Sequence, residues 1–294
     1  MRKRLFVLLI ALAVCGPASR IAAQNATDRL VQSTLEKQKR HPFWFRLRSI
    51  AFGNLPYVFN VKTSTVKYDA DGNPKKLMKD GATEAYATGV FTPIEDVMFY
   101  TPIAFMGMPV DAKTTKEWEG KRDKTITDAK RRSPAEKARI QADIEKKRLE
   151  RSQFWDEFMK AFQFQTLEKR IHNGRPTTIV SYAPMPGYRP GKVVDTKYLP
   201  KTRGQIWIDD NDEQIAHFEI EFTEDVSAGF GVIGKVYKGS RYRMELAKQI
   251  DNLWLPVLAE TVLRMRTLVT RTNEKYTAEY SNYRKFSTNA EIRT

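Results

Sequence analysis

Residues 203–222 contain the feature that most constrains this fold, because two runs of β-branched and aromatic residues flank one polar cluster. Such a cluster is typical of a turn, so the stretch predicts a β-hairpin. Every second residue of the second run is apolar: Ala216, Phe218, Ile220 and Phe222. Because side chains along a strand point alternately to its two faces, this hairpin has one apolar face and one hydrated face. The apolar face then needs either a partner layer or an apolar ligand.

Three further segments, 235–246, 255–270 and 275–286, alternate in the same way and predict the strands that close the chain. Their apolar positions include Tyr242, Met244, Leu263, Met265, Tyr276 and Tyr280. Repeated alternation of apolar and charged residues is typical of an antiparallel sheet with one hydrated face. We therefore expect an α+β fold, mainly antiparallel β, in which a curved, unclosed half-barrel sheet is covered by helices.

Upstream of these strands the chain has weaker signals. Asn173-Gly174 between two alternating runs predicts another hairpin. Residues 25–40 have helical spacing of apolar residues and predict a short amphipathic helix. Residues 57–68 predict a strand, and the apolar segment 103–108 is expected to be buried in ordinary core packing, although its methionines could also line an adaptable pocket.

Residues 113–151 differ from the rest in composition, with 14 Lys/Arg against 8 Asp/Glu and few apolar residues. Ser133, Pro134 and Glu136 form a favourable helix start, with serine as N-cap, proline at the first position and glutamate at the third. The predicted helix continues to large aromatic residues at 154, 155, 158 and 162. Its first half should stand in solvent and its second half should pack on the sheet, so we expect 113–160 to be a basic helical insertion.

The N-terminus predicts export. Arg2, Lys3 and Arg4 precede about ten apolar residues, a run too short to span a bilayer, which is typical of a secretory signal peptide. Cleavage after Ala23 would leave 24–294 as a single domain, located in the periplasm or associated with the outer membrane. Cys15 lies in a segment that resembles a lipobox, but the bulkier Val14 precedes it, and removal of the cysteine with the signal peptide is the preferred interpretation.

The formal net charge is +15, and removing the four basic residues of 1–23 leaves about +11. In the expected compartment, an anionic membrane surface or lipopolysaccharide phosphates are better partners for this charge than nucleic acid. The alternative is that the excess of Lys and Arg only keeps the surface soluble. The sequence does not indicate an oligomeric state.

Residues that could support catalysis are few. The three histidines, His41, His172 and His217, are far apart in sequence and form no zinc pattern, and no P-loop, dinucleotide fingerprint or nucleophile elbow occurs. We expect no metal and no cofactor. Asp209 and its acidic neighbours lie in a predicted turn, where turn chemistry explains them, although a carboxylate pair for hydrolysis remains open.

Several short motifs follow one another in the second half of the chain. Gly204-Gln205-Ile206-Trp207-Ile208-Asp209 is followed by Lys238-Gly239-Ser240, by Leu253-Trp254-Leu255-Pro256 and by a closing Tyr-x-x-Tyr-Arg-Lys-Phe. Over about 160–287 the chain resembles exported bacterial proteins of the outer-membrane lipoprotein carrier and receptor (LolA/LolB-like) superfamily. This resemblance implies an unclosed β-barrel whose concave apolar face is covered by helices and holds acyl chains.

Three functions are compatible with this sequence. The preferred one is a non-enzymatic exported protein that binds a lipid, lipoprotein or other apolar ligand in a half-barrel cavity. The lining expected for that cavity is Phe218, Ile220, Phe222, Tyr242, Met244, Leu263, Met265, Tyr276 and Tyr280. The alternatives are a cell-envelope interaction or sensor protein with a filled structural core, and a carboxylate-dependent hydrolase.

Overall fold

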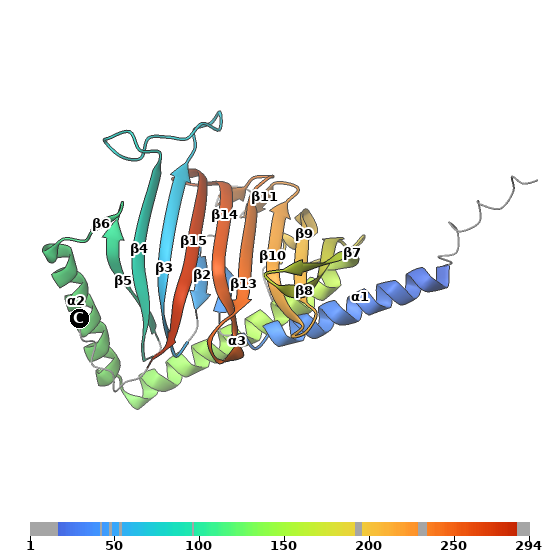
Figure 1. Cartoon of the computed structure of the whole chain (residues 1–294), viewed down its shortest axis with the longest axis horizontal. Coiled ribbons are helices and arrows are strands. Elements are labelled where there is room, and N and C mark those ends of the chain that lie inside the picture. Colours follow the sequence, from blue (N-terminus) through green and yellow to red (C-terminus); the bar gives the residue numbers. More distant parts are fainter. Residues whose placement is uncertain are drawn as a thin grey trace, which may run out of the picture.

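The structure is a computed structural model that describes the backbone of residues 17–41, 43–46, 49–52, 55–95, 97–191, 196–228 and 234–286. Side chains are described over the same ranges except 17–21, 43–46, 49–52 and 228. The elements follow one another along the chain (Figure 1) as α1 (Pro17–Gln38), β1 (Phe43–Arg46), β2 (Ser49–Phe52), β3 (Tyr57–Lys67), β4 (Glu84–Ile94), β5 (Val97–Phe105), β6 (Met108–Pro109), α2 (Ala112–Arg131), α3 (Pro134–Ala161), β7 (Phe162–His172), β8 (Arg175–Pro184), η1 (Leu199–Lys201), β9 (Thr202–Asp209), β10 (Gln214–Phe222), β11 (Val226–Ala228), β12 (Gly234–Val236), β13 (Arg241–Lys248), η3 (Ile250–Asn252), β14 (Trp254–Thr267) and β15 (Arg271–Lys285).

Thirteen strands form one antiparallel sheet, and β1 and β2 form a separate hairpin. The order across the sheet is β6-β5-β4-β3-β15-β14-β13-β10-β9-β8-β7, with β12 beside β14 and β11 beside β12. In this order β6 and β7 are the two outer strands, so the sheet is not closed into a barrel. The predicted fold class, a mainly antiparallel unclosed sheet with helices and a basic helical insertion, is therefore confirmed.

Irregular register bends several strands of the sheet. Register shifts leave an extra residue on β10 at Ala216, on β14 at Val257, and on β15 after Ser281. An extra residue on one strand bends that strand and increases its local twist. Figure 1 shows the result, because the strands turn progressively from the nearly upright β4 to the strongly tilted β7 and β8.

The helix α3 joins the basic insertion to the core. Ser133 accepts a hydrogen bond from the backbone N–H of Glu136, and the Glu136 side chain accepts one from the N–H of Ser133, as the predicted capping box requires. The first half of α3 is largely exposed, while Phe154, Trp155 and Phe158 in its second half are buried. The prediction of a solvated first half and a docked second half is confirmed.

Packing between α3 and the sheet centres on one ring. The Phe158 ring lies 4.6 Å from Phe162, 5.0 Å from Tyr182 and 6.1 Å from Phe218, measured between ring centroids. Its side chain has no exposed surface. Phe158 therefore connects the helix to β7, β8 and β10 at once.

The helix α1 covers the same region of the sheet. Its Val31 and Leu35 are buried, which confirms the predicted amphipathic helix. Polar contacts hold it in place, because Lys37 Nζ donates to the carbonyl of Asp212 at 2.8 Å and to the Glu213 carboxylate at 2.9 Å. The predicted signal peptide, with Cys15, falls largely on residues 1–16, outside the described residues, so export stays a prediction.

Gly204 on β9 is required by a close approach between neighbouring strands. A Cβ atom at this position would lie 1.8 Å from the carbonyl oxygen of Glu219 and 2.6 Å from the Tyr182 hydroxyl. The Tyr182 side chain instead passes over the glycine, and its hydroxyl donates to that carbonyl at 2.6 Å. A side chain at 204 would displace this buried tyrosine.

Two strand predictions have wrong boundaries. The predicted strand 235–246 is divided into β12 and β13 by a turn in which Gly239 has a φ of +82°. The predicted strand 255–270 ends at Thr267, because Leu268 and Val269 form the turn between β14 and β15. No glycine, proline or asparagine marks that turn, so the sequence carries no local signal that the strand ends there.

The expectation that 103–108 is buried is wrong for its largest side chains. Ile103 is 48 % exposed, Phe105 44 % and Met108 67 %. These residues lie on β5 and β6 at the outer edge of the sheet, and β6 has only two residues. Helix contact reaches this edge through α2, whose Trp118 packs on Phe99 and Tyr100 of β5.

Candidate functional site

The strand register places the nine predicted lining residues on one face of the sheet, called here the apolar face. Two cross-strand rows run along it: Phe218, Met244, Ala259, Ala278, Thr63 and Ala87 in the first, and Ile220, Tyr242, Thr261, Tyr276, Thr65 and Ala85 in the second. Phe222, Leu263, Met265 and Tyr280 lie on the same face by the two-residue period of their strands.

Burial divides these nine residues into three groups. Phe218, Tyr242, Met244 and Tyr280 are buried in the main core, and Ile220 and Tyr276 are partly buried against it. Phe222 and Leu263 are buried outside that cluster, and Met265 is half-buried near the β14–β15 turn. Much of the predicted lining is therefore packed against protein, and its half-buried members lie on β10, β14 and β15.

Helices cover the apolar face unevenly. Within the described residues, α1 packs on β7 and β10, α3 on β7, β8 and β10, and α2 on β5. On β3, β4 and β15 the apolar face keeps half-buried side chains, called here the open region: Thr63, Thr65, Ala85, Ala87 and Tyr276. Four of the five are small. Ala87 is also in register with the exposed Phe105, so the open region continues to the sheet edge.

An aromatic ladder on the same face borders the open region. Phe59 stacks on Phe91 at 5.2 Å, Phe91 lies 5.3 Å from Tyr100, and Tyr100 lies 6.0 Å from Trp118 of α2, between ring centroids. Burial raises the pKa of Tyr100 above its ordinary value, so the hydroxyl stays protonated. The ladder thus forms an apolar, aromatic wall on that side of the open region.

The opposite face of the sheet is charged. Lys275 lies 2.7 Å and Arg243 3.6 Å from the Glu260 carboxylate, and Arg203 pairs with Glu221 at 3.1 Å, which makes short cross-strand ion pairs. A pocket of about 340 Å³ lies on this face, lined by Lys62, Ser64, Glu84, Tyr86, Thr277 and Glu279. Its lining is polar, so it does not suit an apolar ligand.

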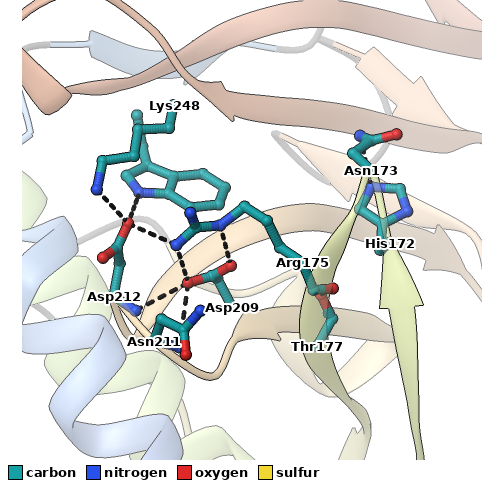
Figure 2. A network of polar contacts seen from close by, with 9 residues as sticks. His172, Asn173, Arg175, Thr177, Asp209, Asn211, Asp212 and Lys248 are labelled. Carbon is teal, nitrogen blue, oxygen red and sulfur yellow. Dashed lines mark hydrogen bonds and ion pairs between the residues drawn. The ribbon is translucent and has the colours of Figure 1, made fainter.

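The acidic turn between β9 and β10 holds a partly buried ion network (Figure 2). Arg175 donates from Nε to Asp209 at 2.5 Å and from Nη2 to Asp209 at 2.8 Å and to Asp212 at 2.9 Å. Lys248 reaches Asp212 at 3.0 Å, and the indole N–H of Trp254 donates to the same oxygen at 3.0 Å.

This network has structural rather than catalytic geometry. The Asp209 side chain is fully buried and also accepts from the backbone N–H groups of Asn211 and Asp212. Burial has the largest effect and raises its pKa, but the hydrogen bonds from Arg175 and from the Asp212 backbone, together with the Arg175 charge, outweigh it and leave the pKa below the ordinary value. Lys248 likewise lowers the pKa of Asp212. Both carboxylates are thus ionised and engaged, which confirms the turn interpretation of these residues.

A second polar cluster contains two of the histidines. His217 Nδ1 lies 2.8 Å from Glu245, and His172 Nε2 lies 3.3 Å from the other oxygen of that carboxylate. His217 was expected on a hydrated face, and it does lie on the charged face, but Trp207 stacks on it at 4.4 Å and buries it. Sequence reasoning missed this grouping because β7, β10 and β13 are separate in sequence.

Among the residues whose placement is described, no group of three or more His, Cys, Asp or Glu side chains is placed to hold a metal ion. Among the same residues, no helix is both long enough and apolar enough to cross a membrane.

The sequence matches no protein-family model and no curated protein. Several solved structures are similar to this chain at low TM-scores. A protein of the DUF1329 family from Desulfovibrio piger has a TM-score of 0.31 at 10 % identity, with 92 % of this chain and 95 % of that chain covered. A domain described as an outer membrane lipoprotein-sorting protein from Vibrio parahaemolyticus has a TM-score of 0.29 at 11 % identity, with coverages of 92 % and 95 %.

A LolA superfamily protein from Nitrosomonas europaea has a TM-score of 0.27 at 11 % identity, and the match covers 86 % of this chain and 92 % of that chain. The resemblance to LolA/LolB-like proteins predicted from the sequence is thus found among solved structures.

Proposed function

We propose that this protein is an exported, non-enzymatic binding protein that takes up the acyl chain of a lipid, a lipoprotein or another amphiphile against the open region of the apolar face. The observation that carries this proposal is the row of small, half-buried side chains at Thr63, Thr65, Ala85 and Ala87. They continue the apolar face beyond the strands that helices cover.

The physical argument is that the described helices leave part of the apolar face uncovered. Burying apolar surface contributes about 25 cal/mol per Å², so an apolar sheet face is normally covered by side chains from a second layer. Large residues on the face itself could fill the space, but four of the five residues of the open region are small. An acyl chain is apolar, narrow and flexible, and it can lie along such a row between the aromatic ladder and Tyr276.

Under this proposal the nine predicted lining residues take different roles. Tyr276, Met265 and Ile220, which retain exposed surface, border the bound chain. The buried members, such as Met244 on β13 and Phe218 on β10, belong to the packed core beside it on the same face. The opposite, charged face of the sheet would remain in water. The proposal that the protein is exported rests on the predicted signal peptide 1–23.

A second candidate function is an envelope interaction protein with a filled core. The deep burial of Phe218, Tyr242 and Met244 supports it, since these residues have exposed fractions of only 3 %, 4 % and 0 %. In that case the open region would be too shallow to take a ligand. The two functions make different predictions for a single substitution on β4.

Substituting Ala87→Trp should weaken binding of a fluorescent fatty-acid probe about tenfold or more, equivalent to about 1.4 kcal/mol, because the indole would occupy the space proposed for the acyl chain. The matched control is Thr88→Trp, which places the same side chain on the next residue but on the charged face. Fluorescence titration of purified protein measures both affinities, and the control should bind like the wild type.

Three results decide the matter. Loss in Ala87→Trp alone supports the acyl-chain site. Equal loss in both variants would mean that the fold, not the site, was disturbed. Absence of probe binding by the wild-type protein would contradict the proposal and favour the filled core.

A further inference from the structure

The turn between β14 and β15 exposes two aliphatic side chains almost completely. Val269 is 90 % and Leu268 71 % exposed, the two highest values among the large hydrophobic residues whose side chains are described. No other residue of the turn covers them. Leaving two aliphatic side chains in water at the tip of a hairpin gives no folding benefit.

Folding does not require apolar residues at this turn. The flanking threonines close it: Thr267 donates its N–H to the carbonyl of Thr270 at 2.8 Å, and the N–H of Thr270 donates to the Thr267 hydroxyl at 3.1 Å. Other hairpin turns of this chain use polar or glycine residues, as Asn173 and Gly174 do between β7 and β8. Leu268 and Val269 are therefore candidates for a binding role.

Basic residues surround the tip. The register pairs Arg266 of β14 directly with Arg271 of β15, and Lys235 of β12 is opposite Arg266 on its other side. Like charges directly opposite one another destabilise a sheet. Arg264, Arg266 and Arg271 are all exposed, and none of them forms an ion pair with a described residue. Lys235 is paired with Asp225 at 2.6 Å.

We propose that this hairpin tip, comprising Thr267–Thr270 with Arg264, Arg266 and Arg271, docks the protein on an anionic phospholipid bilayer. Leu268 and Val269 enter the headgroup–acyl boundary, and the three arginines contact lipid phosphates. Apolar side chains combined with flanking cations are the combination that holds peripheral proteins at a bilayer surface. Guanidinium groups suit phosphate oxygens because they can donate two parallel hydrogen bonds.

The position of the tip relates this docking to the proposed function. The start of β15 pairs with the end of β3, where Glu274 is in register with Lys67, so the tip lies at the same end of the sheet as the β3–β4 connection (Figure 1). From the tip, Met265 and Leu263 lead along the apolar face toward Tyr276 of the open region. Docking would bring that end of the face to the membrane, but it does not depend on ligand binding.

Flotation of the purified protein with phospholipid vesicles tests the proposal. Wild-type protein should float with vesicles of phosphatidylglycerol and phosphatidylcholine, and much less with phosphatidylcholine alone. Leu268→Asp combined with Val269→Asp should lower the bound fraction about tenfold or more, because two charges would then have to enter the bilayer boundary.

Arg266→Glu separates binding from folding. It should weaken vesicle binding several-fold, while the thermal midpoint stays equal or rises, because the introduced carboxylate would attract Arg271 and Lys235 where the native guanidinium repels them. The matched controls lie on α3, where Lys137→Glu makes the same charge change and Leu149→Asp makes an aliphatic-to-acidic change. Both controls should bind vesicles like the wild type.

Each outcome bears on the proposal. It is overturned if the wild type does not bind anionic vesicles, if the tip variants bind like the wild type, or if Lys137→Glu weakens binding as much as Arg266→Glu. Probe binding without vesicles distinguishes this site from the acyl-chain site. Tip variants should retain the fatty-acid probe, whereas Ala87→Trp should lose the probe and still float.

Discussion

Replacing Phe158 by alanine is expected to lower the free energy of unfolding by about 3–5 kcal/mol, the range measured for removing a fully buried aromatic ring. Phe158 contacts rings on α3, β7, β8 and β10, so its loss would leave a cavity where the helix meets the sheet. Rigid strands on one side limit how far this cavity can collapse. Denaturant unfolding followed by near-ultraviolet circular dichroism measures the change.

Leu149→Ala provides the control for this prediction. Leu149 lies on the same helix and is 56 % exposed, so its truncation should change stability by no more than about 0.5 kcal/mol. A loss below about 1 kcal/mol for Phe158→Ala would mean that α3 is not docked as described, because truncation of a docked aromatic residue costs several times more.

The second large effect is expected at the acidic turn. Asp209→Ala should destabilise the protein by about 3–5 kcal/mol, since it leaves the Arg175 guanidinium without its main partner and removes the acceptor for two backbone N–H groups. The exposed pair of Glu224 with Lys201, 3.7 Å apart, gives the comparison. Glu224→Ala should cost at most about 1 kcal/mol, because solvent screens that pair.

The same network predicts a pH dependence. The pKa values of Asp209 and Asp212 are lowered in the folded protein, so their stabilising contribution is complete above the unfolded-state pKa of about 3.9. It is lost as pH falls through the lowered folded-state values. Urea titrations from pH 6 downward should therefore show less loss of stability on acidification in Asp209→Ala than in the wild type. A parallel pH dependence of the two proteins would contradict the assignment.

The strands and helices with strong local signals were predictable from the sequence. Alternation at Phe218 and Ile220 predicted one face of β10, Asn173-Gly174 predicted the β7–β8 hairpin, and the Ser133 cap predicted the start of α3. Each of these signals comes from residues close together in the chain, where local backbone geometry determines which secondary structure forms.

Long-range placement was not predictable from such patterns. The pairing of β3 with β15 joins residues about 200 positions apart, and nothing in either strand specifies the other. The exposure of Phe105 and Met108 follows from the position of β5 and β6 at the sheet edge, which a local apolar run does not reveal. The only sequence signal for the ion pair between Arg175 and Asp209 is their position beside two turns. Arg175 follows the turn between β7 and β8, and Asp209 begins the turn between β9 and β10.

The candidate site shows the same limit. Alternation identified the residues of the apolar face, but how much of that face is covered depends on where α1, α2 and α3 pack. The small residues Ala85 and Ala87 were not singled out, since alanine carries little signal in a strand. The turn at Leu268 and Val269 was overlooked because it lacks the residues that usually mark a turn.

Photo-crosslinking with a diazirine-bearing fatty acid, followed by peptide mapping, tests the central claim most directly. If the acyl chain lies against the open region of the apolar face, labels should map to the segments containing Thr63, Thr65, Ala85, Ala87 and Tyr276. Labels confined to the charged face or to α2 and α3, or no label above that of the Ala87→Trp protein, would contradict the account.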